Sequence, residues 1–193
     1  MTLPVEAMNI SESIQISISS IFNDVNQALA QGITLTESQT QTIVIEPILK
    51  TLGYNVWEYQ KTATSEITGQ IPDYTMLPNT EFEWFLEVKK WKLILSEREA
   101  KQAVNYAANQ GKRWAVLTNG DEWRIYDANC HEDLTRKCIF TTELSSSTAI
   151  ETLSLLTKES MQQNLLAASH RARLLTESVQ RELSTINSET VRI

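Results

Sequence analysis

The run Phe85–Lys90, with the sequence FLEVKK, constrains the fold of this chain more than any other stretch. Side chains in a β-strand alternate between the two faces of the sheet. Glu87 and Lys89 should therefore share one face, while Leu86 and Val88 point to the other. The run predicts a strongly hydrophobic, central strand that carries a carboxylate and an ammonium group side by side at the edge of a core.

A second acid, Asp73, follows a proline in the segment IPDY just before this run. If that segment forms the neighbouring strand, Asp73 converges with Glu87 and Lys89 on one point. Two carboxylates and a lysine can hold a divalent cation and position water for phosphodiester hydrolysis. The plainer interpretation is that Glu87 and Lys89 form a surface pair and that Asp73 is a turn residue. These residues on their own leave both interpretations open.

Hydrophobic periodicity and turn signals predict helices around a small mixed sheet. An amphipathic helix is expected over 10–31, and Thr36 with Gln39 forms a capping box that begins a second helix ending near Gly53. Strands are expected over 54–60, 71–77, 82–91, 113–118, 123–126 and 137–141, and further helices over 96–110, 150–156 and 159–186. The first three strands should form an antiparallel meander, and the helix over 96–110 can cross over to a parallel neighbour.

These elements predict an α/β fold with a mixed sheet of about five strands flanked by helices. We expect an N-terminal helix in residues 1–32, a sheet-containing domain in 33–145 and a C-terminal helical extension in 146–193. The long helix of this extension either folds back on the domain or faces a partner, and a homodimer through the terminal helices is one hypothesis.

The composition excludes some functions. There is no apolar run of eighteen residues and no basic N-terminal region, so a cytoplasmic protein without a signal peptide or membrane span is expected. The net charge of −7 argues against a protein that coats nucleic acid nonspecifically. It leaves room for an enzyme with a small local basic patch. Candidates for such a patch are Lys61, Lys89, Lys90, Lys92, Arg98, Lys101 and Lys112.

The cysteines and histidines do not suggest a metal or catalytic site. Cys130 and Cys138 lack the spacing and the additional ligands of a zinc site, so reduced thiols are expected. His131 and His170 are isolated in the sequence and are predicted to lie at the surface.

The ordered motifs resemble the PD-(D/E)xK nuclease superfamily. The likeness is greatest to the N-terminal nuclease domain of type I restriction enzyme R subunits and to stand-alone relatives that lack the helicase motor. It covers roughly residues 33–128 and rests on the motifs TESQT (36–40), EPILKTLGY (46–54), IPDY (71–74), LEVK (86–89), QAVNY (102–106), RWAVLTNG (113–120) and WRIY (123–126). The resemblance implies a restriction-endonuclease-like fold and a Mg²⁺-dependent DNA endonuclease, with Mn²⁺ as an alternative metal.

The resemblance also implies a role for each matching residue. Asp73 and Glu87 would bind the metal, and Lys89 would position or activate the attacking water. A lysine beside two carboxylates stays protonated unless buried, which favours an electrostatic role over that of a general base. Gln102 would orient the lysine or the scissile phosphate, and Tyr106 would support its helix or contact DNA.

Glu37 would be an accessory metal-binding acid on the second helix, although the helix dipole alone could favour an acid there. On an ideal helix Glu37 and Glu46 point in opposite directions, so Glu37 is expected toward the core and Glu46 toward solvent. The chain has no GxxxxGK[ST] motif, so no ATP site is expected. Restriction-modification subunits are a partner hypothesis. The competing hypothesis is a catalytically silent nuclease-fold module that acts in DNA binding or protein–protein assembly.

Overall fold

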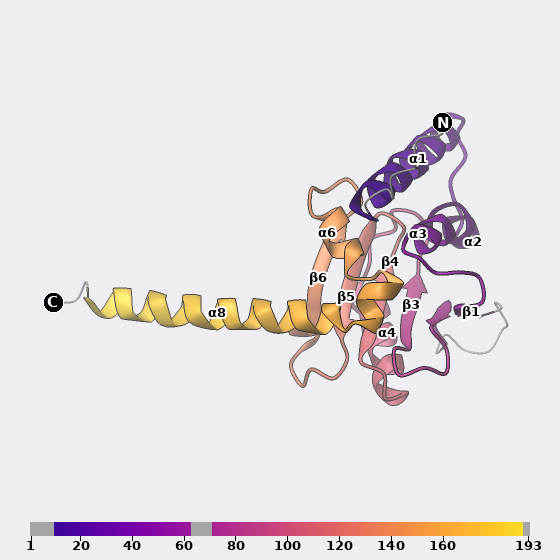
Figure 1. The fold of residues 1–193 in the computed structure, drawn as a ribbon. Coiled ribbons are helices and arrows are strands. Elements are labelled where there is room, and N and C mark those ends of the chain that lie inside the picture. The colour runs from indigo at the N-terminus through magenta and orange to yellow at the C-terminus, as the bar shows by residue number, and fades with distance from the viewer. Residues whose placement is uncertain (1–9, 63–70, 191–193) are drawn as a thin grey trace, which may run out of the picture.

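The computed structural model describes residues 10–62 and 71–190, with side chains up to residue 185. Residues 1–9 of the predicted N-terminal segment, residues 63–70 between the first two predicted strands, and residues 191–193 lie outside these ranges. The fold places a mixed sheet at the centre and one long helix that projects from it (Figure 1).

The sheet has six strands in the order β1-β2-β3-β4-β5-β6. They are β1 (Tyr59–Lys61), β2 (Tyr74–Met76), β3 (Trp84–Val88), β4 (Trp114–Thr118), β5 (Glu122–Asp127) and β6 (Cys138–Glu143). β3 and β4 are parallel and are joined by α4 (Glu97–Asn109), while the other neighbours are antiparallel. The predicted α/β class, the meander and the crossover are confirmed, and the strand predicted over 137–141 is the sixth strand of the sheet, β6.

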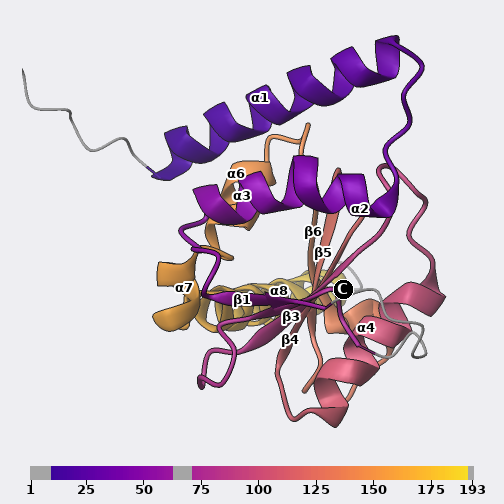
Figure 2. The same ribbon diagram turned by 90° about the vertical axis from the view of Figure 1, so that its right-hand side faces the viewer.

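Helices cover both faces of the sheet. On one side lie α1 (Ile10–Ala30), α2 (Glu37–Thr40), the π-helix η1 (Gln41–Ile45) and α3 (Glu46–Thr51), and on the other lies α4, as Figure 2 shows. The remaining helices are α5 (Leu134–Lys137), α6 (Ala149–Ser154), α7 (Lys158–Gln162) and α8 (Leu165–Thr190). No helix in the described ranges is long and apolar enough to cross a membrane.

The alternation of side chains along β3 creates two hydrophobic cores. Leu86 and Val88 belong to the larger core on the side of α1 and α3, whereas Phe85 belongs to the smaller core under α4. All five residues of β3 are buried, which confirms the predicted central strand. Glu87 points to the α4 face by the same alternation and is buried there.

Three predicted strands are longer than the observed ones. The segment 54–60 contributes only its end to β1, because Tyr54 donates a hydrogen bond to the Leu156 carbonyl and residues 55–58 form a turn. β2 and β3 are also shorter than 71–77 and 82–91. Asp73 therefore lies immediately before β2 rather than inside a strand.

The predicted helix over 159–186 is interrupted. Asn164 adopts a left-handed backbone conformation with φ of 55°, which asparagine tolerates better than most residues, and separates α7 from α8. This break lets the start of α8 pack on the domain through Leu166 and Ala167, which are buried. The rest of α8 then extends away from the domain (Figure 1).

His170 is not at the surface as predicted. It is 6% exposed on α8, and its Nδ1 lies 3.4 Å from Oδ2 of Asp127. Both cysteines are free thiols, which confirms that prediction.

Candidate active site

Asp73 is held rigidly where β2 meets β3. The register pairs Tyr74 with Leu86, so Asp73 stands next to the Glu87–Val88 end of β3. The backbone N–H of Val88 donates to Oδ2 of Asp73 at 2.6 Å. The Nε2 group of Gln41 donates to Oδ1 at 3.0 Å. With a donor on each oxygen, the carboxylate has one fixed orientation.

Glu87 and Lys89 form the second part of the site. Nζ of Lys89 donates to Oε1 of Glu87 at 2.6 Å, as their shared strand face predicts. Nζ of Lys89 also lies 3.9 Å from Oε2 of Glu37, which α2 carries. Glu87 is only 5% exposed, whereas the side chain of Glu37 is 42% exposed. One lysine thus joins an acid of the sheet to an acid of the helical layer.

The pKa values of all three acids are raised, and burial is the largest cause in each case. Burial and the charge of Asp73 raise the pKa of Glu87 to about 6, although Lys89 opposes the rise. Burial also raises the pKa of Asp73, against the hydrogen bond from Val88 and the charge of Lys89. The pKa of Glu37 is raised by burial and, more weakly, by Asp73. For each of the three acids, burial raises the pKa by more than the charge of Lys89 lowers it.

Lys89 remains a cation in this site. Burial favours the neutral amine, but Glu87, Glu37 and Asp73 together raise the pKa of Lys89 above its usual value. The side chain therefore provides a positive charge rather than a base.

The π-helix η1 places two residues whose positions the sequence did not predict. A π turn follows an i→i+5 pattern and changes the direction of the residues that come after it. Gln41, on η1, reaches Asp73. Glu46 was expected to point to solvent, and this prediction is wrong: its Oε1 accepts hydrogen bonds from Nζ of Lys61 at 2.8 Å and the Tyr74 hydroxyl at 3.1 Å. Pro47, which lacks a backbone N–H, is the sequence signal of an irregular turn in this helix. π turns are often found at functional sites.

A tight contact fixes the end of α2 to the segment that follows β3. The hydroxyl of Thr40 accepts a hydrogen bond from the backbone N–H of Trp91 at 2.9 Å. Gly120, with φ of 89°, sits against both residues, and a Cβ there would come within 2.6 Å of the Trp91 ring. Only glycine fits this point, so the turn after β4 also holds the site together.

Gln102 and Tyr106 lie beside the site rather than among its charges. Both are on α4, and no described residue receives a hydrogen bond from Gln102. They line a pocket with Ile71, which is two residues from Asp73. Tyr106 packs edge-to-face on Phe85 of β3 with ring centroids 4.8 Å apart. The structure thus brings together Asp73, Glu87, Lys89 and Glu37, and places Gln102 and Tyr106 next to them.

Most of the basic residues that could have formed a DNA-binding patch have acidic partners. Lys61 pairs with Glu46, Lys92 with Asp121, Lys101 with Glu97 and Lys112 with Glu83. Within the described ranges, no ion pair of 4.0 Å or less involves Lys90 or Arg98. The basic charge is therefore spread over local pairs.

The acids of the site match the ligand preference of a hard cation. Within residues 10–62 and 71–190, no group of three or more His, Cys, Asp or Glu side chains is gathered into a ready-made metal cluster. Asp73, Glu87 and Glu37 nevertheless provide only oxygen donors, which Mg²⁺ prefers. The three carboxylates share one lysine, and burial raises the pKa of each, so a bound cation would stabilise their charged forms.

Comparisons with protein family models, curated proteins and solved structures found no match for this chain. A function for it must therefore follow from the geometry and chemistry of the site.

Proposed function

We propose that this chain is a Mg²⁺-dependent DNA endonuclease of the PD-(D/E)xK type, similar to the nuclease domain of type I restriction enzyme R subunits. The observation that carries the proposal is the convergence of Asp73, Glu87 and Lys89 at the end of β3, with Glu37 on the opposite side of the lysine. The resemblance to this superfamily implies the same four residues, in the same order along the chain.

Each residue has a chemical role that follows from its contacts. Asp73 is fixed by its two hydrogen bonds and presents a carboxylate of defined orientation. Lys89 is held by Glu87 and offers its remaining N–H donors to a phosphate oxygen or to the attacking water. The positive charge of Lys89 stabilises the negative charge that develops on the phosphate.

Asp73 and Glu87, with Glu37 as the accessory acid, would hold the Mg²⁺ or Mn²⁺ ion. When bound, such an ion lowers the pKa of water and neutralises phosphate charge. Glu87 must be ionised to act as a ligand, and its pKa of about 6 places that ionisation just below neutral pH. Activity should therefore fall as the pH decreases through about 6.

The test is cleavage of supercoiled plasmid DNA by the purified chain in Mg²⁺, in Mn²⁺ and in EDTA. The proposal predicts nicked and linear products with either metal, no products in EDTA, and no products from the Asp73→Asn variant. Gln180→Ala, on the projecting part of α8, is the matched control and should cleave like the wild type. Identical behaviour of wild type and Asp73→Asn in every metal would refute the proposal.

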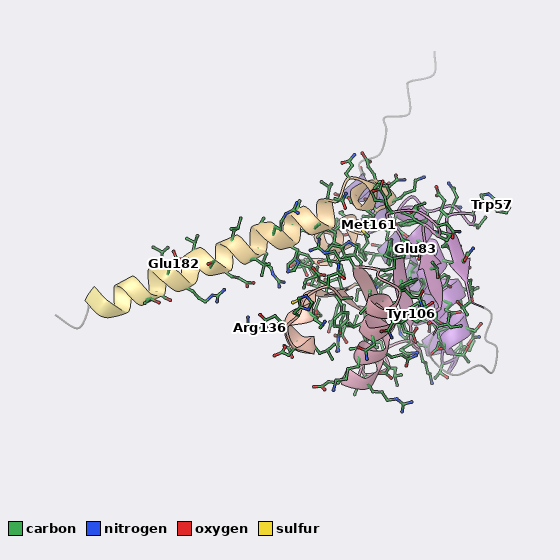
Figure 3. All side chains as sticks on the ribbon, turned by 90° about the horizontal axis from the view of Figure 1, so that it is seen from below. Trp57, Glu83, Tyr106, Arg136, Met161 and Glu182 are labelled. Carbon is green, nitrogen blue, oxygen red and sulfur yellow. The ribbon has the colours of Figure 1, made fainter. Side chains whose placement is uncertain are left out.

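A second candidate function is supported by α8. Beyond the domain, this helix exposes Leu175, Val179 and Leu183 at helical spacing, with exposed fractions of 68%, 54% and 55%. Figure 3 places Glu182 on this projecting part, far from the sheet. We propose that the helix associates with a second copy of the chain or with restriction-modification subunits. Such a role does not require catalysis, so it would also serve a catalytically silent module.

Light scattering on Leu175→Ser/Val179→Ser/Leu183→Ser tests this assembly role. Loss of a dimer seen in the wild type would support it, and an unchanged oligomeric state would contradict self-association. These exposed residues lie outside the domain, so the fold should persist in the triple variant.

A further inference from the structure

A polar pocket of about 610 Å³ lies beside the candidate active site. It is lined by Ile71, Gln102, Asn105, Tyr106, Asn109 and Gln110. Figure 3 shows the molecule from the α4 side and labels Tyr106 on that helix. The volume is within the range of about 300–1,000 Å³ that is usual for small-ligand sites.

Two links connect this pocket to the site. Ile71 is two residues before Asp73 in the chain. Glu99 on α4 is close enough to raise the pKa of Glu37, and Lys89 in turn lowers the pKa of Glu99. Glu99 and Gln102 are three positions apart and so lie on the same side of the helix. The pocket therefore begins about one helical turn beyond the charged residues.

The described lining residues are unusual for a nucleic-acid site because all of them are neutral. Four of these six carry carboxamides, and none of the four side chains makes a hydrogen bond to any residue in the described ranges. A carboxamide offers both donors and an acceptor, which matches the edges of nucleobases. Phosphate binding relies instead on Arg and Lys, and neither contributes to the pocket among the described residues.

Two further residues suit a flat, aromatic ligand. Tyr106 is fixed by its edge-to-face contact with Phe85. Aromatic side chains are the usual stacking partners of unpaired bases. Ile71 is 50% exposed and adds apolar surface at the pocket wall. A base inside a duplex has its pairing edge covered and cannot enter a pocket, so the ligand must be unpaired.

We propose that this pocket binds an unpaired nucleobase of single-stranded DNA next to the phosphate to be cleaved. The position beside a scissile phosphate rests on the nuclease function proposed above, whereas binding of the base does not. The pocket makes single-stranded DNA, or an unpaired stretch within a duplex, the preferred substrate class. It also gives an acidic protein a means of holding DNA that depends little on positive charge.

Fluorescence anisotropy in EDTA, where no cleavage occurs, tests this inference. The probes are a labelled single-stranded oligo-dA, an abasic oligonucleotide of the same length, and a duplex. The wild type should bind oligo-dA about tenfold more tightly than the abasic strand or the duplex, as expected for a stacked and hydrogen-bonded base. Equal binding of oligo-dA and the abasic strand, or binding of the duplex as tight as that of oligo-dA, would overturn the inference.

Variants identify the pocket as the source of this preference. Asn105→Ala/Asn109→Ala should remove most of the tenfold difference, while Asn105→Gln/Asn109→Gln should keep part of it. Both asparagines are exposed and alanine favours helices, so the fold is retained. The matched control Gln180→Ala replaces an exposed amide on another helix and should bind like the wild type. A double alanine variant that keeps the full preference would also overturn the inference.

Salt dependence distinguishes base contacts from phosphate contacts. Loss of a phosphate contact reduces the slope of log K against log salt, by roughly 0.7 per contact for single strands. The double alanine variant should therefore bind more weakly with an unchanged slope. A reduced slope would assign Asn105 and Asn109 to the backbone and refute base binding.

The two proposals can fail separately. A chain that cleaves plasmid but does not prefer oligo-dA over the abasic strand refutes the base pocket and leaves the nuclease. A chain that prefers oligo-dA but cleaves in no metal refutes the nuclease and leaves a single-stranded DNA-binding module.

Discussion

Glu87 on β3 and Asp127 on β5 are both buried carboxylates of the same sheet, but their surroundings differ. Asp127 accepts two hydrogen bonds on Oδ2 from the Arg113 guanidinium, at 3.0 and 2.7 Å, and one on Oδ1 from the backbone N–H of Asn129. Glu87 has Lys89 as its cationic partner but shares that lysine with two other acids. The structural acid has a dedicated cation, whereas the acid of the candidate site does not.

The difference shows how one sheet can carry charges for stability and charges for chemistry. Burying a charge is costly unless partners satisfy it, and Arg113 satisfies Asp127 with two donors. At the candidate site the acids outnumber the lysine, and burial with mutual repulsion raises the pKa of Glu87 to about 6. More acids than lysines in a buried site lower the stability of the fold when no metal is bound, and they favour the binding of a metal cation.

The largest expected effect is loss of cleavage at the candidate site. Asp73→Asn removes the charge but keeps the size of the side chain, and should reduce Mg²⁺-dependent plasmid cleavage by roughly 10²- to 10³-fold, the usual effect of removing one preorganised electrostatic group. Asparagine can accept only one of the two hydrogen bonds that Asp73 accepts, so urea unfolding should show a folded variant that is less stable by about 1 kcal/mol. A variant that is inactive only because it is unfolded would show that Asp73, like Asp127, serves stability rather than chemistry.

The next effect is loss of stability at the structural acid. Arg113→Ala leaves Asp127 buried without its main partner and should reduce the free energy of unfolding by about 3 kcal/mol. The estimate is at the low end for a broken buried pair because the Arg113 side chain is partly exposed. Urea denaturation at pH 7.5 measures it, with Arg98→Ala on exposed α4 surface as the control. A loss below about 1 kcal/mol would mean that this pair is no stronger than a surface pair.

A smaller effect of opposite sign is expected for Glu87→Gln. The raised pKa of Glu87 means that its contribution to stability is present below about pH 4.5 and is lost as the pH rises through about 6. Glutamine does not ionise, so the variant should equal the wild type below pH 4.5 and be more stable by about 1 kcal/mol above pH 6. Denaturation curves from pH 4 to 8 test this. A variant that is less stable at pH 7.5 would show that Glu87 is as well satisfied as Asp127.

The smallest effect concerns Gln41. Its hydrogen bond lowers the pKa of Asp73 against the effect of burial, so Gln41→Leu should raise that pKa further. Carbon-13 NMR of the Asp73 carboxyl group measures the change in its pKa. Leucine is chosen because glutamate at position 41 would add another acid. Gln27→Leu, on the exposed surface of α1, is the control. An unchanged Asp73 pKa in Gln41→Leu would show that the amide does not position this carboxylate.

The parts of the fold that follow local rules could be predicted from the sequence. The alternation in FLEVKK predicts the buried strand and the contact between Glu87 and Lys89, because both depend on a period of two residues. The Ser96–Glu99 capping box predicts the start of α4, since its hydrogen bonds lie within four residues.

Features that depend on distant residues could not be predicted. The contact between Gln41 and Asp73 spans 32 positions and depends on a π turn. Pro47 signals an irregular helix there but not the direction of the side chains. The same turn reverses the prediction for Glu46. His170 is buried because α8 restarts after Asn164 and brings this histidine beside Asp127 of β5. The position of His170 in the sequence gives no sign of that contact. In each case tertiary packing decides a position that helical periodicity leaves open.

The most direct test of the central claim is a crystal structure of the wild-type chain soaked in Mn²⁺, with anomalous diffraction recorded for the metal. The acid surplus predicts one anomalous peak between Asp73 and Glu87, at about 2.0–2.6 Å from their oxygens. It also predicts no peak at Asp127, where Arg113 already satisfies the charge. A map with no peak at Asp73 and Glu87, or with a peak only elsewhere, would contradict the claim that these acids form a metal-dependent catalytic site.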